Sequence, residues 1–125
     1  MKRKIENRAD VDELVERFYA KALKDPLIGF IFTEIAKIDP VYHFPRIQDF
    51  WASILLETHH FQGNVMQVHL FLNRKVSLEP AFFERWLAHW DATVDELFSG
   101  ERAERAKQRA HSIATMMQLK ISRTE

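Results

Sequence analysis

The stretch "VDELVERFYAKAL", Val11 to Leu23, carries the pattern from which the fold can be predicted. Its apolar residues recur at the i, i+3, i+4, i+7 spacing of an amphipathic helix. They are Val11, Leu14, Val15, Phe18, Tyr19, Ala22 and Leu23. We expect this helix to begin at Asp10, where Asp10 and Glu13 form a close variant of a capping box, and to end at Asp25-Pro26.

The segments that follow also indicate helices with short connections, because only three Gly and four Pro occur in 125 residues. "PLIGFIFTEI" (26–35) is short and broken by Gly29, which favours a tight turn or single helical turns. A second long helix is expected over 40–58. Pro45 would lie inside it and remove a hydrogen bond, so we expect a kink or a fresh helix start near His43. The apolar stripe of this helix is Ile47, Phe50, Trp51, Ile54 and Leu55, with His43 on the same face.

The second half of the chain predicts three more helices. "HHFQGN" (59–64) is typical of a turn, and "NVMQVHLF" (64–71) of a short helix capped by Asn64. Glu79-Pro80 opens a long helix, which "FSGER" (98–102) ends with Gly100 as its C-terminal cap. A last helix is expected over 101–121. The predicted inner faces are Phe83, Trp86, Leu87, Trp90, Val94 and Leu97, followed by Ala103, Ala106, Ala110, Ile113, Ala114 and Met117.

These elements predict an all-α fold in one domain over residues 1–125, with 1–9 and 122–125 as flexible tails. Eighteen basic residues balance eighteen acidic ones, so net charge gives no reason to expect nucleic acid or a membrane as partner. The absence of cysteine excludes disulfides, thiolate metal sites and cysteine nucleophiles. No phosphate-binding loop, serine elbow or HExxH motif occurs. No apolar run approaches the length of a membrane span. We expect a cytoplasmic protein that is a monomer or a weak dimer.

His69 is the one titratable residue in the apolar stretch "NVMQVHLFL" (64–72). It could be an axial ligand of iron or zinc, or a core histidine bonded to a carbonyl. His43 adds a second histidine on an apolar helix face, and two such histidines could flank a planar ligand. Tyr19 and Trp86 add hydrogen-bond donors on inner helix faces, where each would need a partner. The residues by themselves leave both interpretations open.

The other histidines are weaker candidates for ligands. His59 and His60 lie in a polar turn and could form a metal site with His69. His89 is expected at the boundary of the core rather than as a ligand. His111 lies among polar residues of the last helix.

Taken together, several segments resemble a known family, the group III truncated haemoglobins. The matching segments are "LVERFYAKALKD", "IFTEI", "HFPRIQDFWASILL", "VHLFL" and "FFERWLAHW". They follow the family's order and approximate spacing, and the resemblance spans about Val11 to Ile121. The combination of "DFW", a later histidine before an apolar pair, and "FFERW" is specific to this group.

The resemblance implies an abbreviated globin fold, two helices packed over two around a haem b. His69 matches the proximal histidine that binds the iron, and Tyr19 and Trp86 match the two distal donors. His43 matches the residue at the distal entrance. Further matches are Ile47 on the distal wall, Phe32 on the porphyrin, and Phe50 with Trp51 on the distal helix. Arg46, Arg74 and Lys75 are candidate propionate partners by location.

By the same resemblance, we expect reversible binding of oxygen or a related diatomic ligand, NO or CO, at ferrous iron. Two distal donors suit scavenging or chemistry better than oxygen transport. NO detoxification or peroxidase-like chemistry would make the protein an enzyme, and NO chemistry would require a separate reductase, since no flavin or nicotinamide motif occurs. The alternatives are a haem-free helical interaction module and a metal-binding bundle that uses His59, His60 and His69.

Overall fold

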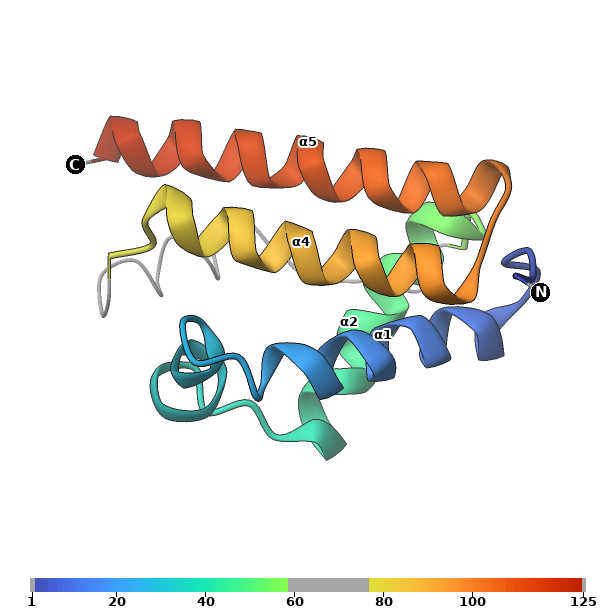
Figure 1. Cartoon of the computed structure of the whole chain (residues 1–125), viewed down its shortest axis with the longest axis horizontal. Coiled ribbons are helices and arrows are strands. Elements are labelled where there is room, and N and C mark those ends of the chain that lie inside the picture. Colours follow the sequence, from blue (N-terminus) through green and yellow to red (C-terminus); the bar gives the residue numbers. More distant parts are fainter. Residues whose placement is uncertain (1, 59–76, 125) are drawn as a thin grey trace.

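The computed structural model describes residues 2–58 and 77–124, and within them the regular elements are all helices. They are α1 (Arg8–Ala22), the π-helix η1 (Ile31–Ile35), α2 (Pro40–Leu55), α4 (Pro80–Leu97) and α5 (Glu101–Thr124). Helix α4 packs between α5 and α1, and α2 contacts both α1 and α5 (Figure 1). The prediction of an all-α, two-over-two fold is confirmed.

Helix α1 begins earlier than expected, because its N-cap is Asn7 rather than Asp10. The Asn7 side chain accepts a hydrogen bond from the Asp10 amide at 3.1 Å, and the Asp10 carboxylate accepts one from the Asn7 amide at 3.4 Å. These reciprocal bonds form a capping box in which Asp10 is the third helical residue. The predicted role of Asp10 as the cap was therefore wrong, although it does belong to the box. The predicted inner face is buried.

Helix α2 runs continuously through Pro45, so of the two predicted outcomes, a kink or a fresh helix start near His43, the fresh start is wrong. Pro45 lies near the N-terminal end, so its ring removes only the bond that its amide would have given to the Val41 carbonyl. Val41 is 85% exposed, and water can bond to this carbonyl instead. The helix ends at Leu55 rather than near Thr58, because Glu57 adopts a left-handed backbone with φ of 57°.

The connection between α4 and α5 is tied to the N-terminal residues, which we had expected to form a tail. The Arg3 amide donates to the Leu97 carbonyl, and the Ser99 amide donates to the Arg3 carbonyl. Ile5 is only 2% exposed within the core. This apolar side chain and the two backbone bonds explain why the segment packs against the helices.

Gly100 does not cap α4 as predicted. The C-cap is Phe98, in an extended conformation. Gly100 instead has φ of 100°, which favours glycine, and it directly precedes α5. Its carbonyl accepts a bond from the Glu104 amide at 3.1 Å. Gly100 therefore stands at the start of the last helix rather than at the end of the previous one.

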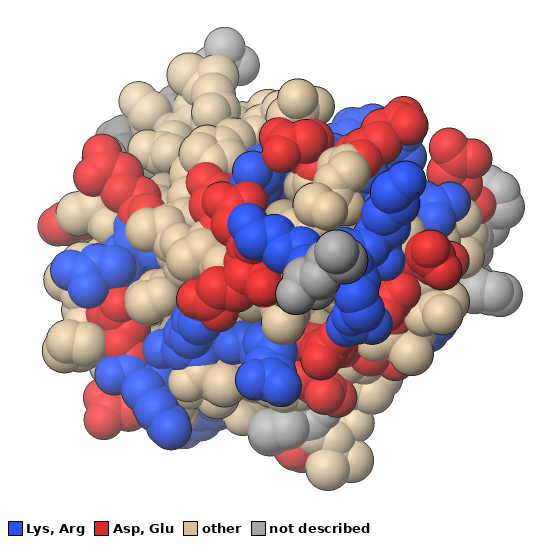
Figure 2. All heavy atoms as spheres, turned by 45° about the vertical axis from the view of Figure 1, so that its right-hand side comes forward, with Lys and Arg blue, Asp and Glu red and all other residues tan. Residues whose placement is uncertain are grey.

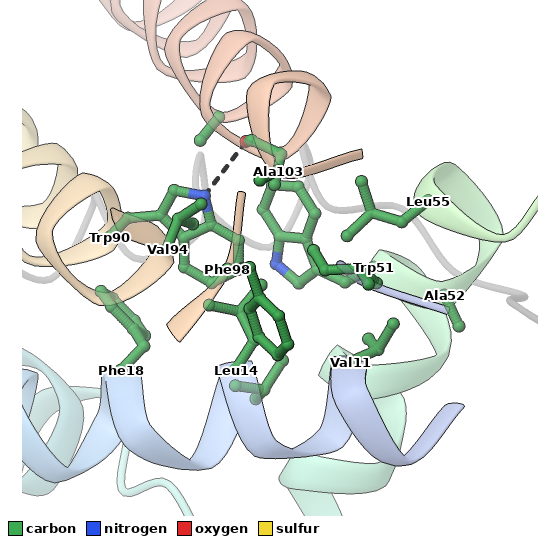
Figure 3. Packing of buried hydrophobic residues seen from close by; sticks show 14 of the residues in the cluster. Val11, Leu14, Phe18, Trp51, Ala52, Leu55, Trp90, Val94, Phe98 and Ala103 are labelled. Atoms are coloured by element: carbon green, nitrogen blue, oxygen red, sulfur yellow. Dashed lines mark hydrogen bonds between the residues drawn. The ribbon is translucent and has the colours of Figure 1, made fainter. Parts of the chain in front are cut away.

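The centre of the core is a pair of stacked indoles. The rings of Trp51 from α2 and Trp90 from α4 lie 4.3 Å apart between centroids and 24° from parallel. The Trp90 indole N–H donates to the Ala106 carbonyl of α5 at 3.0 Å (Figure 3). The small α5 residues facing α4 are buried as predicted: Ala103, Ala106, Ala110 and Ala114. They let the two helices approach closely, and the indole bond then ties α4 to α5.

The face of the molecule drawn in Figure 2 mixes both signs of charge without a large patch of either. This agrees with the balanced composition of the chain. Among the residues that the structure describes, no helix combines the length and the apolar character needed to span a lipid bilayer.

Candidate functional site

Tyr19 places a phenol hydroxyl inside the apolar core at the end of α1. The residue is 7% exposed, and burial raises the pKa of the phenol because the charged form is disfavoured away from water. The group therefore stays protonated and able to donate at neutral pH. No hydrogen bond joins it to another described residue. A buried donor is costly unless some group accepts its bond, and residues 2–58 and 77–124 supply no acceptor for this hydroxyl.

Three phenylalanines surround the Tyr19 ring. Phe18 and Phe32 meet it edge-on, with centroids 4.9 and 5.5 Å away, and Phe44 lies 4.9 Å away at a tilt of 33°. Phe32 comes from η1 and Phe44 from α2, so three elements converge on this phenol. Such edge and offset contacts each add about 0.5–1.5 kcal/mol beyond area burial. They fix the ring in place.

Trp86 brings a second indole to the same region, on α4. Its ring is nearly parallel to that of Trp90, 8° apart with centroids separated by 6.3 Å, and it meets Phe18 edge-on at 5.9 Å. The two indoles differ in their N–H groups. That of Trp90 is bonded to Ala106, whereas within residues 2–58 and 77–124 no hydrogen bond joins the N–H of Trp86 to the protein. Trp86 is also only partly buried.

Phe18 connects the two candidate donors. Its ring contacts both Tyr19 and Trp86, so the structure brings these two predicted residues around one aromatic side chain. Phe32 and Ile47, also predicted, pack against the same cluster. Phe18 and Phe44 were not identified as site residues from the sequence. Phe18 is on the predicted inner stripe of α1, but nothing in Phe44's sequence position distinguished it from an ordinary helix residue.

His43 lies apart from this cluster, in the first turn of α2. Its Nδ1 accepts a bond from the Asp39 amide at 2.9 Å, and its ring meets Tyr42 edge-on at 5.0 Å. Nδ1 also lies 3.2 Å from the Asp39 carbonyl oxygen, so both backbone polar groups of Asp39 face the same ring nitrogen. The imidazole thus caps its own helix in this structure. Arg46 stacks on the Tyr42 ring at 4.6 Å.

Phe50 and Trp51 take different positions on α2. Their rings meet edge-on at 5.4 Å. Trp51 is buried against Trp90 in the core, whereas Phe50 is only partly buried. Trp51 therefore packs against α4 in the core, through its stacking on Trp90.

Several predicted site residues lie outside the described residues: His59, His60, His69, Arg74 and Lys75. The predicted short helix over 64–71 and the turn before it lie there as well. In the part of the chain that is described, no group of three or more His, Cys, Asp or Glu side chains is arranged to hold a metal ion. The described side chains around Tyr19 and Trp86 form one wall of a candidate site.

One ionic cluster beside this wall was not predicted from the sequence. Asp25 follows α1, and its carboxylate accepts bonds from Arg85 at 3.1 Å and from His89 at 2.5 Å. Burial of this carboxylate raises its pKa, but the bonds from His89, from the Leu27 and Ile28 amides and from Arg85 outweigh that effect and bring the pKa down to about 2 from 3.8. His89, expected at the core boundary, has 24% of its side chain exposed.

The comparisons with known proteins identify the family. No family model matches the chain. A curated protein named "Group 3 truncated hemoglobin ctb", from Campylobacter jejuni, is 31% identical over 115 residues, which cover 90% of this chain and 88% of that protein. The chain belongs to the group III truncated haemoglobins. The crystal structure of the group III truncated hemoglobin from Campylobacter jejuni superposes with a TM-score of 0.80, at 31% identity, over 97% of this chain and 95% of that one.

Membership of this truncated haemoglobin family implies a haem cofactor. The described residues fit one. Tyr19 offers a buried hydroxyl, and Trp86 offers a partly buried indole N–H. Neither donor has a hydrogen-bond partner among these residues. The side chains around both are aromatic. An apolar, aromatic surface with a few donors is typical of sites for a flat, largely apolar cofactor.

Proposed function

We propose that this truncated haemoglobin binds haem b through His69 and reversibly binds oxygen, or the related ligands NO and CO, beside Tyr19 and Trp86. When bound, the haem supplies a ferrous iron that binds a diatomic ligand. The observation that carries the proposal is a pair of donors, the Tyr19 hydroxyl and the Trp86 indole N–H, held around Phe18 with no hydrogen-bond acceptor among the described residues. Family membership supports the cofactor.

The two donors would stabilise a diatomic ligand in which negative charge develops. Hydrogen bonds to charged groups contribute about 1.5–3 kcal/mol, more than neutral ones. The surrounding Phe32 and Phe44 rings would exclude water, and the low local dielectric strengthens each bond. Because burial keeps Tyr19 protonated, its donation would not weaken as pH rises through neutrality.

In this proposal, Phe32 would pack on the porphyrin and Ile47 would line the distal wall, while Arg74 and Lys75 would pair with the propionates. His43 would stand at the distal entrance. Its present contacts with Asp39 use Nδ1, which leaves Nε2 as the ring nitrogen that it could turn toward the pocket. Arg46 is a further propionate candidate, currently stacked on Tyr42.

Strong retention of the ligand favours scavenging or redox chemistry over transport. The same donors would polarise a bound peroxide or hold oxygen for reaction with NO, so NO-detoxifying and peroxidase-like activities both belong to the proposal. For NO detoxification, a separate reductase would return the cofactor to the ferrous state.

The test compares the protein reconstituted with haemin, reduced and exposed to CO, with two variants. We expect a sharp Soret band that shifts with CO and that is altered in His69→Ala. In Tyr19→Phe, the haem should bind normally, but oxygen should dissociate about tenfold faster, the effect of one lost hydrogen bond.

Identical spectra for wild type and His69→Ala, with haemin bound only loosely, would instead favour a haem-free helical module. Zinc or iron bound without porphyrin, and lost in a variant without His59 and His60, would favour the metal-binding bundle. Normal ligation with unchanged oxygen dissociation in Tyr19→Phe would contradict the proposed role of the phenol.

A further inference from the structure

Asp25 is a nearly fully buried carboxylate that joins two elements distant in sequence. Its side chain is 2% exposed. Oδ1 accepts bonds from the Leu27 and Ile28 amides at 2.6 and 3.2 Å, and Oδ2 accepts bonds from Arg85 and His89. The first pair closes the turn after α1, whereas the second reaches across to α4.

The bond to His89 fixes the form of that imidazole. An ionised carboxylate only accepts hydrogen bonds, so Nε2 of His89 must carry a proton at neutral pH. Because its acceptor is an ionised carboxylate, this bond is charge-assisted. Together with Arg85, it gives Oδ2 two donors separated by one helical turn of α4, which is a more directional tie than a single contact.

The turn after α1 does not require these two additional bonds. The amide bonds to Oδ1 suffice for a local Asp turn. Burying a carboxylate to pair it with Arg and His often gives little net stability, and the best-attested benefit of such groups is that they select one arrangement of the packed elements. We therefore ask which packing of α1 and α4 the buried Asp25 carboxylate selects.

The tie acts on the two helices that carry the candidate donors. Tyr19 lies on α1, six residues before Asp25. Trp86 lies on α4, next to Arg85 and one turn from His89, as i and i+3 neighbours on the helix surface. Phe18 fills the space between Tyr19 and Trp86. Any slide or rotation of α4 along α1 would therefore change the separation of the two donors.

We propose that Asp25 is a positioning residue that, through His89 and Arg85, holds α4 in the register that aims Trp86 and Tyr19 at the same ligand. This inference rests on the proposed function, because it assigns the tie a role in ligand retention. Hydrogen bonds weaken steeply as distance and angle depart from their optimum. A shift of α4 by a fraction of an ångström is then enough to weaken the Trp86 bond without unfolding the protein.

The chain offers a matched control for this tie. His111 on α5 bonds to Asp91 on α4 at 2.7 Å, so it is also a histidine–aspartate pair anchored to α4. It lies at the surface, with 52% of the His111 side chain exposed, and among the described residues it forms no hydrogen bond, ion pair or ring contact with Asp25, Tyr19 or Trp86. His89→Leu and His111→Leu therefore remove comparable pairs with different predicted consequences. His89→Gln keeps an N–H donor near the carboxylate and serves as the rescue variant.

The experiment measures two signals. The indole ¹⁵N–¹H resonance of Trp86 reports its position, with the bonded indole of Trp90 as an internal reference. The CO stretching frequency of the reduced protein reports hydrogen bonding to the ligand. We expect His89→Leu to move both signals and to speed oxygen dissociation by about twofold to tenfold. His111→Leu should leave both at wild-type values, and His89→Gln should lie between.

The inference is overturned if the Trp86 resonance in His89→Leu is the same as in His111→Leu and in wild type. The proposed function is tested separately by the CO stretch of wild type and Tyr19→Phe. If wild type binds no haem, the proposed function fails, while the Trp86 resonance of the haem-free chain still decides whether the tie positions the indole. Because His89→Leu leaves the amide bonds of Asp25 intact, the turn after α1 should still fold.

Discussion

The Nε2 of His89 donates to the buried Oδ2 of Asp25 across 2.5 Å, and so links the segment after α1 to α4. Two backbone amides and Arg85 complete the set of donors around this carboxylate. Every partner favours the ionised form. The strength of these contacts can therefore be measured through the pH dependence of the free energy of unfolding.

Asp25→Asn should show how much stability the charge contributes and at what pH it is lost. The pKa of Asp25 is about 2 in the folded protein and 3.8 ordinarily. Because the folded value is depressed, the ionised carboxylate contributes stability that is fully present above pH 3.8 and is lost as pH falls toward 2. The shift corresponds to about 2 kcal/mol. Urea unfolding of both proteins from about pH 7 to pH 2 should show their difference narrowing below pH 4; a constant difference would contradict the assignment.

Asn7→Ala should destabilise the protein by about 1 kcal/mol, the usual effect of losing an N-cap side chain. The Asn7 side chain accepts the Asp10 amide at 3.1 Å, and alanine leaves that amide to water. Asn7→Ser retains an acceptor and is the control. Denaturant midpoints distinguish this from the capping scheme expected from the sequence, in which Asp10 itself is the cap and Asn7→Ala would have no effect.

Gly29→Ala should lower stability by about 1–3 kcal/mol, because a Cβ would overpack against rigid backbone. Built on this backbone, it would lie 2.7 Å from the Leu23 carbonyl oxygen, closer than atoms can pack without movement. Gly29 precedes η1, which carries Phe32 against Tyr19. Thermal unfolding measures the loss, and a shift in the Tyr19 ring resonances would show that η1 has moved. An unchanged melting temperature would show that the segment after α1 adjusts freely.

The sequence predicted the helices and their inner faces well because periodicity is a local property. The residues expected to face inward on α1, α4 and α5 are buried or packed on the core. It was less reliable at the ends, where Asn7 replaced Asp10 as the cap, and Gly100 proved to start α5. Helix ends depend on individual contacts and backbone angles that periodicity does not specify, here the Asn7 bond to the Asp10 amide and the φ of 100° at Gly100.

The contacts that sequence reasoning missed are long-range. Asp25 reads as a helix-ending residue before Pro26, and nothing local reveals that Arg85 and His89, sixty residues later, will bond to it. Their i, i+4 spacing was a usable signal that they share a helix face. Tyr19 and Trp86 could be named from the sequence, but only the fold brings both to Phe18.

A double-mutant cycle on Tyr19→Phe and Trp86→Phe should show that the two donors act on one ligand. Each single variant should raise the oxygen dissociation rate by about tenfold, from the loss of one hydrogen bond. If both donors bond to the same ligand, the double variant should depart from additivity by about 0.5 kcal/mol or more, as residues that share a partner do. Stopped-flow dissociation gives all four rates.

Trp90→Phe provides the control for this cycle. Its indole is nearly parallel to that of Trp86, but its N–H is already bonded to the Ala106 carbonyl. The substitution should therefore lower stability by about 1 kcal/mol through the lost hydrogen bond, while leaving oxygen dissociation close to the wild-type rate. Faster dissociation in Trp90→Phe than in Trp86→Phe would mean that packing of α4, rather than donation by Trp86, governs the escape of the ligand.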